Sequence, residues 1–149
     1  MKIAIGCDHG GIVLKDAVIK AVVELGHEYE DLGAYDNQSV DYPDYGEKVA
    51  VAVASGNADK GIVLCGTGIG ISIVANKVRG IRCAHITNEF CAQMAAEHNN
   101  ANVIAMGGRI NTEEDAYNMT KKFLTTEFAG GRHATRVDKI MAVEKNNLR

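Results

Sequence analysis

The sequence has no excess of basic residues and no long apolar run, and these absences exclude several classes of protein. Its 149 residues carry 16 lysines and arginines against 19 aspartates and glutamates, so we expect no nucleic-acid partner. No apolar stretch approaches the roughly 18 residues of a membrane span. The N-terminal MKIAIGCDHGG also lacks the pattern of a signal peptide. We therefore expect a cytoplasmic protein with no membrane contact.

The cysteines show no C-x-x-C spacing, which argues against a zinc site and against a thioredoxin motif. They are Cys7, Cys65, Cys83 and Cys91, and we expect them to be reduced thiols. No cluster of His, Asp and Glu has metal-ligand spacing, so no metal is expected. Internal repeats, low-complexity tracts and linkers are also absent from the sequence. The length then favours one domain over residues 1–149.

Strand patterns alternate with helical patterns along the chain. The strand patterns cover 2–7, 27–32, 61–65, 81–86 and 103–106, with a patternless loop over 33–46. Helical patterns cover 14–25, 47–54, 71–78, 89–98, a stretch that starts near Asn111, and 133–145. We predict a doubly wound α/β fold, Rossmann-like or flavodoxin-like, with five parallel strands in the order 2-1-3-4-5. The extra C-terminal helix has no strand to follow, and we expect it to pack on a second subunit.

A glycine-rich stretch, GIVLCGTGIGISIVAN at 61–76, is the strongest candidate for the chemistry. Doubly wound sheets bind ligands at the carboxyl ends of the strands where the winding reverses. In the predicted fold these ends carry Asp8-His9 and Cys65-Gly66-Thr67. Glycine permits close approach of a ligand, and the N–H groups of a helix start attract anions. A thiol and a hydroxyl within such a loop favour a catalytic site over a simple phosphate loop.

Familiar glycine-loop motifs do not fit this stretch. A dinucleotide fingerprint G-x-G-x-x-G that starts at Gly66 meets Ile71 at its third glycine, and one that starts at Gly68 meets Ile73. A P-loop that starts at Gly61 meets Thr67 where lysine is required. A cysteine phosphatase loop needs an arginine where Ile71 stands. What is left is an anion-binding loop with a thiol and no arginine of its own.

Each candidate residue also has a purely structural interpretation. Cys65 can be a small buried hydrophobe, but the glycines and helix start after it favour a reactive thiolate. Asp8 can cap a helix, and His98 can interact favourably with a helix C-terminus. Arg132 and Arg136 are surface charges when taken singly, yet their spacing allows both to face one phosphate.

The whole chain resembles the type B ribose-5-phosphate isomerases and the related galactose-6-phosphate isomerase subunits. The resemblance rests on IAIGCDHGG at 3–11, DYP at 41–43 and CGTGIGISIVANKVRGIR from Cys65. It continues through EHNNANVIAMGGR at 97–109 and GGRHATRV at 130–137. It implies interconversion of ribose 5-phosphate and ribulose 5-phosphate through an enediolate, without a metal or organic cofactor. It also implies a homodimer, or a tetramer, whose sites are shared between subunits.

The resemblance further implies roles for individual residues. Cys65 matches the base that moves a proton between C1 and C2, and His98 matches the histidine that opens the sugar ring. Some relatives carry a glutamate later in the loop instead; Ile71 stands there in this chain, which makes it similar to the cysteine type. Asp8, Thr67, Tyr42 and Asn99 match contacts to the sugar. The chemistry of the reaction itself requires donors to the enediolate, and we expect Gly66, Gly68 and Gly70 to supply them through their N–H groups. His9, Arg109, Arg132 and Arg136 match the phosphate clamp.

Two other functions stay open at this point. An isomerase of a six-carbon sugar phosphate, such as allose 6-phosphate or galactose 6-phosphate, would use the same proton chemistry in a longer pocket. A non-catalytic sugar-phosphate sensor would need neither Cys65 nor His98.

Overall fold

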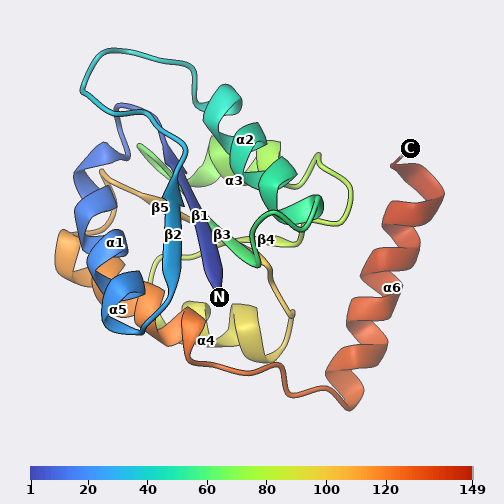
Figure 1. Cartoon of the computed structure of the whole chain (residues 1–149). Coiled ribbons are helices and arrows are strands. Elements are labelled where there is room, and N and C mark those ends of the chain that lie inside the picture. Colours follow the sequence, from blue (N-terminus) through green and yellow to red (C-terminus); the bar gives the residue numbers. More distant parts are fainter. Residues whose placement is uncertain (149) are drawn as a thin grey trace.

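The computed structural model describes residues 1–148, in which helices and strands alternate (Figure 1). The strands are β1 (Lys2–Cys7), β2 (Glu28–Asp31), β3 (Lys60–Cys65), β4 (Cys83–His85) and β5 (Val103–Gly107). A 3-10 turn, η1 (Ile12–Leu14), leads into α1 (Lys15–Glu24). The other helices are α2 (Tyr42–Ala54), α3 (Ile69–Ala75), α4 (Glu89–Glu97), α5 (Glu113–Leu124) and α6 (Arg132–Asn147).

The strands form one parallel sheet in the order β2-β1-β3-β5-β4. The predicted doubly wound α/β class is confirmed, but the predicted order is wrong, because β5 and not β4 pairs with β3. The reason is burial. All residues of β5 are buried, as a central parallel strand requires, whereas β4 is short and partly exposed and suits an edge. The reversal between β1 and β3 is unaffected.

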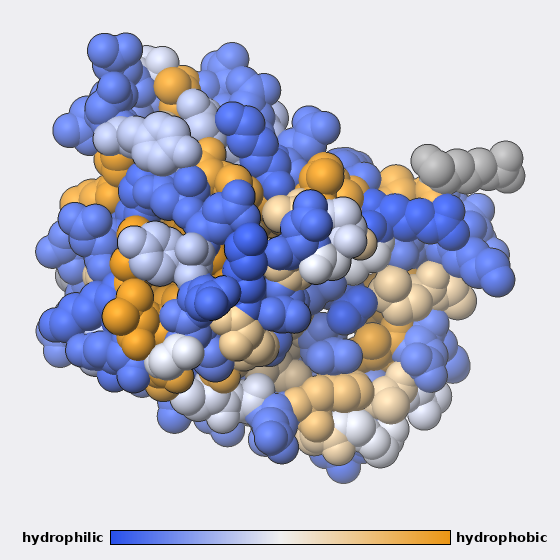
Figure 2. Space-filling view, in the orientation of Figure 1, coloured by the Kyte–Doolittle hydropathy of each residue, from blue (hydrophilic) through white to orange (hydrophobic). Residues whose placement is uncertain are grey.

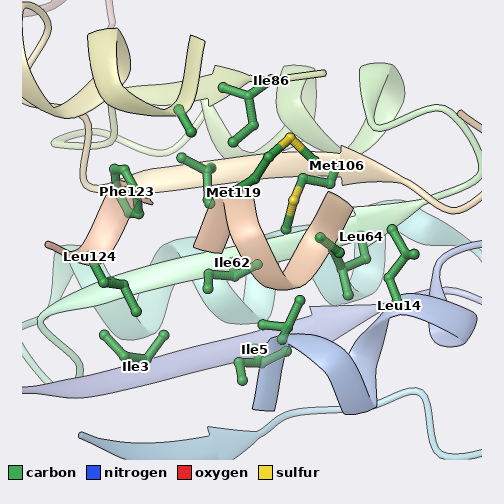
Figure 3. Packing of buried hydrophobic residues seen from close by; sticks show 14 of the residues in the cluster. Ile3, Ile5, Leu14, Ile62, Leu64, Ile86, Met106, Met119, Phe123 and Leu124 are labelled. Carbon is green, nitrogen blue, oxygen red and sulfur yellow. The ribbon is translucent and has the colours of Figure 1, made fainter. Parts of the chain in front are cut away.

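Apolar side chains fill both faces of the sheet. On one face, Ile3, Ile5, Ile62, Leu64 and Met106 pack with buried residues of α1, α4 and α5. Figure 3 shows this layer, in which Met119, Phe123 and Leu124 of α5 lie over the strands. On the other face, alternate strand residues such as Ala4, Val63, Cys65 and Ala105 pack with α2 and α3. Cys65 is therefore anchored in the core, and it ends its strand next to the loop that follows.

Three details of the helices differ from the predictions. Helix α2 begins at Tyr42, within the predicted loop, because Pro43 is compatible with a first turn, where its missing N–H is not needed. In α4 the helical spacing predicts that Phe90 and Cys91 pack inward, but alanines face the core instead, and Phe90 (68% exposed) and Cys91 are exposed. The cap of α5 is Thr112 in a capping box with Asp115, one residue after Asn111.

Helix α6 stands apart from the sheet and its covering helices (Figure 1). It meets the β4 edge through two polar contacts, from the Gly80 N–H to Glu144 Oε1 (2.7 Å) and from Arg82 Nη1 to Met141 Sδ (3.4 Å). A cavity of about 330 Å³ lies between Ile140 and this edge. Val137 is buried, but Ile140 and Val143 are exposed. Figure 2 shows apolar residues, in orange and tan, on the part of the surface where α6 lies.

Candidate active site

The carboxyl ends of the central strands bring several predicted residues together. β1 ends at Cys7, and Cys65 at the end of β3 pairs with Gly107 at the end of β5. The loops after these strands enclose a cavity of about 380 Å³. Its lining contains Asp8, Tyr42, Cys65, Gly66, Thr67, Ile69, Gly70 and Arg109. Of these, Ile69 was not among the predicted site residues.

Cys65 is 4% exposed, and its sulfur accepts a hydrogen bond from the N–H of Gly68 (3.0 Å). Gly68 has φ = 81°, a left-handed conformation that L side chains rarely adopt. Thr67 Oγ1 accepts from the N–H of Ile69 (3.1 Å) as α3 begins. A donor aimed at the sulfur stabilises negative charge on it, which suits a thiol that acts as a base.

Successive carbonyl groups of the loop accept hydrogen bonds from the residues that directly follow β5. Cys65 O accepts from the Gly108 N–H and Gly66 O from the Arg109 N–H, both at 2.9 Å. Because a trans peptide holds its C=O and N–H on opposite sides, the N–H groups of Gly66 and Thr67 point away from β5. The loop thus has oriented peptide donors beside the thiol. Gly66 and Thr67 precede α3, which begins at Ile69, so these donors belong to the loop and not to the helix.

Asp8 and His9 organise the loop after β1. Asp8 is buried, and its Oδ1 accepts from the N–H groups of Gly10 (2.8 Å) and Gly11 (2.9 Å). His9 Nδ1 accepts from the N–H of Val40 (3.1 Å), which ties this loop to the one before α2. A neutral ring that accepts at Nδ1 carries its proton at Nε2, so His9 presents a donor there.

Two other thiols are unsuited to ionisation. Burial raises the pKa of Cys7 to about 11 and that of Cys83 to about 12. Both groups are therefore protonated at neutral pH. Cys91 is exposed on α4. Neither Cys7, Cys83 nor Cys91 lines the cavity that contains Cys65.

The remaining predicted residues lie elsewhere. α4 starts after the carboxyl end of β4 and ends shortly before β5 begins, so His98 and Asn99 lie toward the amino edge of the sheet. The ring of His98 stacks on that of His133 at the start of α6, with centroids 4.0 Å apart. Desolvation, with the nearby charges of His98, Arg132 and Arg136, lowers the pKa of His133. His98, Asn99, Arg132 and Arg136 thus form a second group, outside the Cys65 cavity.

The length of β5 separates these two groups. Val103 pairs with Gly61, and four residues on Gly107 pairs with Cys65, about 13 Å along the strand. One chain therefore carries its predicted site residues in two groups, at opposite edges of its sheet. We name them the thiol half-site (Asp8, His9, Tyr42, Cys65 to Gly70, Arg109) and the histidine half-site (His98, Asn99, Arg132, Arg136).

No group of three or more His, Cys, Asp or Glu side chains that could hold a metal ion occurs within residues 1–148. Over the same residues, no helix is both long and apolar enough to cross a membrane. His85, which the sequence did not single out, donates from Nε2 to the carbonyl oxygen of Thr67 in the loop (2.9 Å). The signal that could have identified it is its position at the carboxyl end of a strand, the edge of the sheet at which Asp8, Cys65 and Arg109 also lie.

The fold and the thiol half-site define a doubly wound α/β protein with a cavity where the winding reverses, the place at which such folds bind ligands. The family described as Ribose/Galactose Isomerase matches residues 3–140, and the chain belongs to this family. It is 44% identical to ribose-5-phosphate isomerase B of Escherichia coli, over 97% of each chain.

Solved structures agree with this membership. The chain superposes on ribose-5-phosphate isomerase B of Clostridium thermocellum with a TM-score of 0.94 and 53% identity, over 98% of this chain and 99% of that one. With ribose-5-phosphate isomerase B of Mycoplasma genitalium the TM-score is 0.92 at 37% identity, over 98% and 97% of the two chains. That protein was solved with bound ribulose-5-phosphate.

Proposed function

We propose that this protein interconverts ribose 5-phosphate and ribulose 5-phosphate as a homodimer, with each active site built from the thiol half-site of one subunit and the histidine half-site of the other. The observation that carries the proposal is the cavity in which Cys65 lies beside Asp8, Thr67 and Arg109. The names of the relatives support the substrate.

The proton chemistry follows from the surroundings of Cys65. In the open-chain aldose, the Cys65 thiolate takes the proton from C2, and the electron pair of that bond forms the enediolate with charge on O1. The hydroxyl proton of O2 then moves to O1, and the thiol returns its proton to C1 as O2 becomes the carbonyl oxygen. Asp8, Thr67 and Tyr42 line the same cavity and would bind the sugar hydroxyls. Acid–base placement of this kind contributes roughly 10²–10⁴ in rate.

The enediolate requires donors, which the loop peptides can supply. The carbonyls of Cys65 and Gly66 are held by Gly108 and Arg109, so the peptide planes are fixed before substrate arrives. Fixed donors cost no reorganisation during reaction, and loss of one such donor typically costs about 10²–10³ in turnover.

Ring opening and phosphate binding are assigned to the histidine half-site of the partner subunit. His98 would transfer the proton that opens the furanose, with Asn99 next to it at the sugar. Arg132 and Arg136 lie one turn apart on α6 and can grip one phosphate, together with His9 and Arg109 of the thiol half-site. Phosphate binding then supplies remote binding energy for positioning the sugar.

A second copy of the chain is also the expected cover for α6. The exposed Ile140 and Val143, with the cavity behind Ile140, leave the helix poorly covered within one chain. Burying such a surface in a symmetric dimer stabilises both subunits.

The deciding experiment compares turnover of ribose 5-phosphate, allose 6-phosphate and galactose 6-phosphate, with deuterium uptake from heavy water recorded for each. We expect the highest kcat/KM for ribose 5-phosphate, with deuterium entering at the reacting carbon. A preference for either hexose phosphate would replace the five-carbon assignment. Tight binding of all three without turnover or deuterium uptake would indicate a sensor.

A further inference from the structure

His85 and the Cys65 sulfur contact the same peptide group from opposite sides, His85 at its C=O and the sulfur at its N–H. The imidazole Nε2 is 2.9 Å from the carbonyl oxygen of Thr67. The N–H of that same Thr67–Gly68 peptide donates to Cys65 Sγ at 3.0 Å. One rigid peptide plane thus connects His85 to the thiol.

We propose that His85 is a positioning residue, which holds the Thr67–Gly68 peptide so that its N–H stays aimed at Cys65. The proposal deepens the proposed function, on which it rests. Because the acceptor is a carbonyl oxygen, the imidazole carries a proton at Nε2 and donates it. Donation to the C=O polarises the peptide and strengthens the bond from its N–H to sulfur.

With the contact from His85, three successive carbonyl groups of the loop each accept a hydrogen bond. The carbonyls of Cys65 and Gly66 are held by backbone N–H groups of Gly108 and Arg109, at the end of β5. At Thr67 the partner is instead a side chain from the neighbouring strand, β4. Without that side chain, water would compete for the Thr67 carbonyl, and the peptide would be free to tilt.

Packing restricts the same peptide. A Cβ atom placed on Gly68 would lie 2.9 Å from Cδ2 and 3.0 Å from Nε2 of His85, and 2.8 Å from the carbonyl carbon of Met106. The imidazole therefore lies directly against Gly68, with the end of β5 close by. Glycine is required there both by φ = 81° and by this contact.

The test measures the thiolate directly, so that it is independent of whether the sugar substrate is correct. All proteins carry Cys91→Ser, which removes the exposed thiol, and alkylation of Cys65 by iodoacetamide at pH 7 is followed by peptide mass spectrometry. His85→Leu removes the donor, whereas His85→Gln places an amide N–H at a similar reach. His27→Leu, at the amino edge of the sheet, is the matched control. Asp8, Tyr42 and Arg109 share the cavity with Cys65 and are unchanged throughout.

We expect His85→Leu to slow alkylation of Cys65 about threefold to tenfold, the range of one hydrogen bond, with most of the rate restored in His85→Gln. In turnover of ribose 5-phosphate, kcat should fall in the same order, while KM changes little because His85 does not line the cavity. Parental alkylation rates in His85→Leu would overturn the proposal, as would equal losses in the Leu and Gln variants. If His85→Leu does not fold by circular dichroism, His85→Ser provides the same comparison. A protein that shows the alkylation pattern but no isomerase activity would refute the proposed function and leave the role of His85 intact.

Discussion

The imidazole of His98 is stacked on that of His133, with ring planes 12° from parallel and centroids 4.0 Å apart. This contact joins the end of α4 to the start of α6, and it brings Arg132 and Arg136 into the surroundings of the histidines. It also fixes the histidine half-site at the edge of the sheet opposite to Cys65. We therefore expect a site that uses both His98 and Cys65 to be built from two chains.

Mixed dimers test this division. In the proposed homodimer, we expect Cys65→Ala and His98→Asn each to inactivate both sites of their own dimer. After denaturation and refolding of an equal mixture, half of the dimers are mixed, and each has one intact site. We therefore expect recovery of about a quarter of the parent activity.

The control mixture combines Cys65→Ala with Thr67→Ala, which both change the thiol half-site. Every active site in that mixture carries one substitution, so we expect its activity to stay at the level of the separate variants. Recovery of activity in the control mixture, or no recovery in the first mixture, would contradict an active site built from the half-sites of two subunits.

Cys65→Ala should abolish proton exchange while leaving substrate binding largely in place. Removal of the sulfur takes away the proposed base but not the arginines or the loop peptides. We expect a loss of at least about 10²-fold in kcat and in deuterium uptake from heavy water, with substrate affinity by calorimetry within a few-fold of the parent. Cys91→Ser is the matched thiol control. Turnover retained in Cys65→Ala would contradict the assignment of the base.

Much of the fold could be predicted from the sequence, because periodicity reports burial. β1 occurs at the predicted residues, and the edge position of β2 follows from its interrupted apolar pattern. The exchange of β4 and β5 could not be seen, since neighbours in a sheet are set by packing between elements far apart in the chain. The continuous apolar pattern of 103–106 suits a central strand, but it does not show which strand lies beside it.

The site was predictable in part for a similar reason. Strand ends at one edge of a parallel sheet predict that Asp8 and Cys65 lie together, and both line one cavity. The sequence by itself could not tell which edge His98 occupies relative to Cys65, because that depends on the direction of α4 across the sheet. His85 was missed because its contact is to a backbone carbonyl, which leaves no pattern of residue types.

Arg136→Ala should weaken binding of phosphorylated sugars more than it affects the chemistry. A charge-assisted hydrogen bond to phosphate contributes about 1.5–3 kcal/mol, so we expect KM to rise about 10- to 100-fold with a smaller change in kcat. Arg79→Ala, a change at another exposed arginine, is the control and should leave KM unchanged. Unchanged KM in both variants would remove Arg136 from the phosphate clamp.

Cys83 should make the protein less stable in alkali. Burial raises the pKa of its thiol from the ordinary value of 9.0 to about 12. Between these values the native state keeps a proton that the unfolded chain has lost, so the free energy of unfolding falls as pH rises. For one group the fall approaches about 1.4 kcal/mol per pH unit. Cys83→Val lacks this contribution, and we expect its stability to decline less steeply between pH 9 and 11 than that of the parent.

Urea unfolding at pH 8, 9, 10 and 11, at one protein concentration, measures the two slopes. Valine suits this position because it is similar in size to cysteine and favourable in a strand. Cys91→Ser, a change at an exposed thiol, should keep the parental slope. The same slope in Cys83→Val and the parent would mean that the Cys83 thiol ionises as readily in the native protein as in the unfolded chain, contrary to its burial.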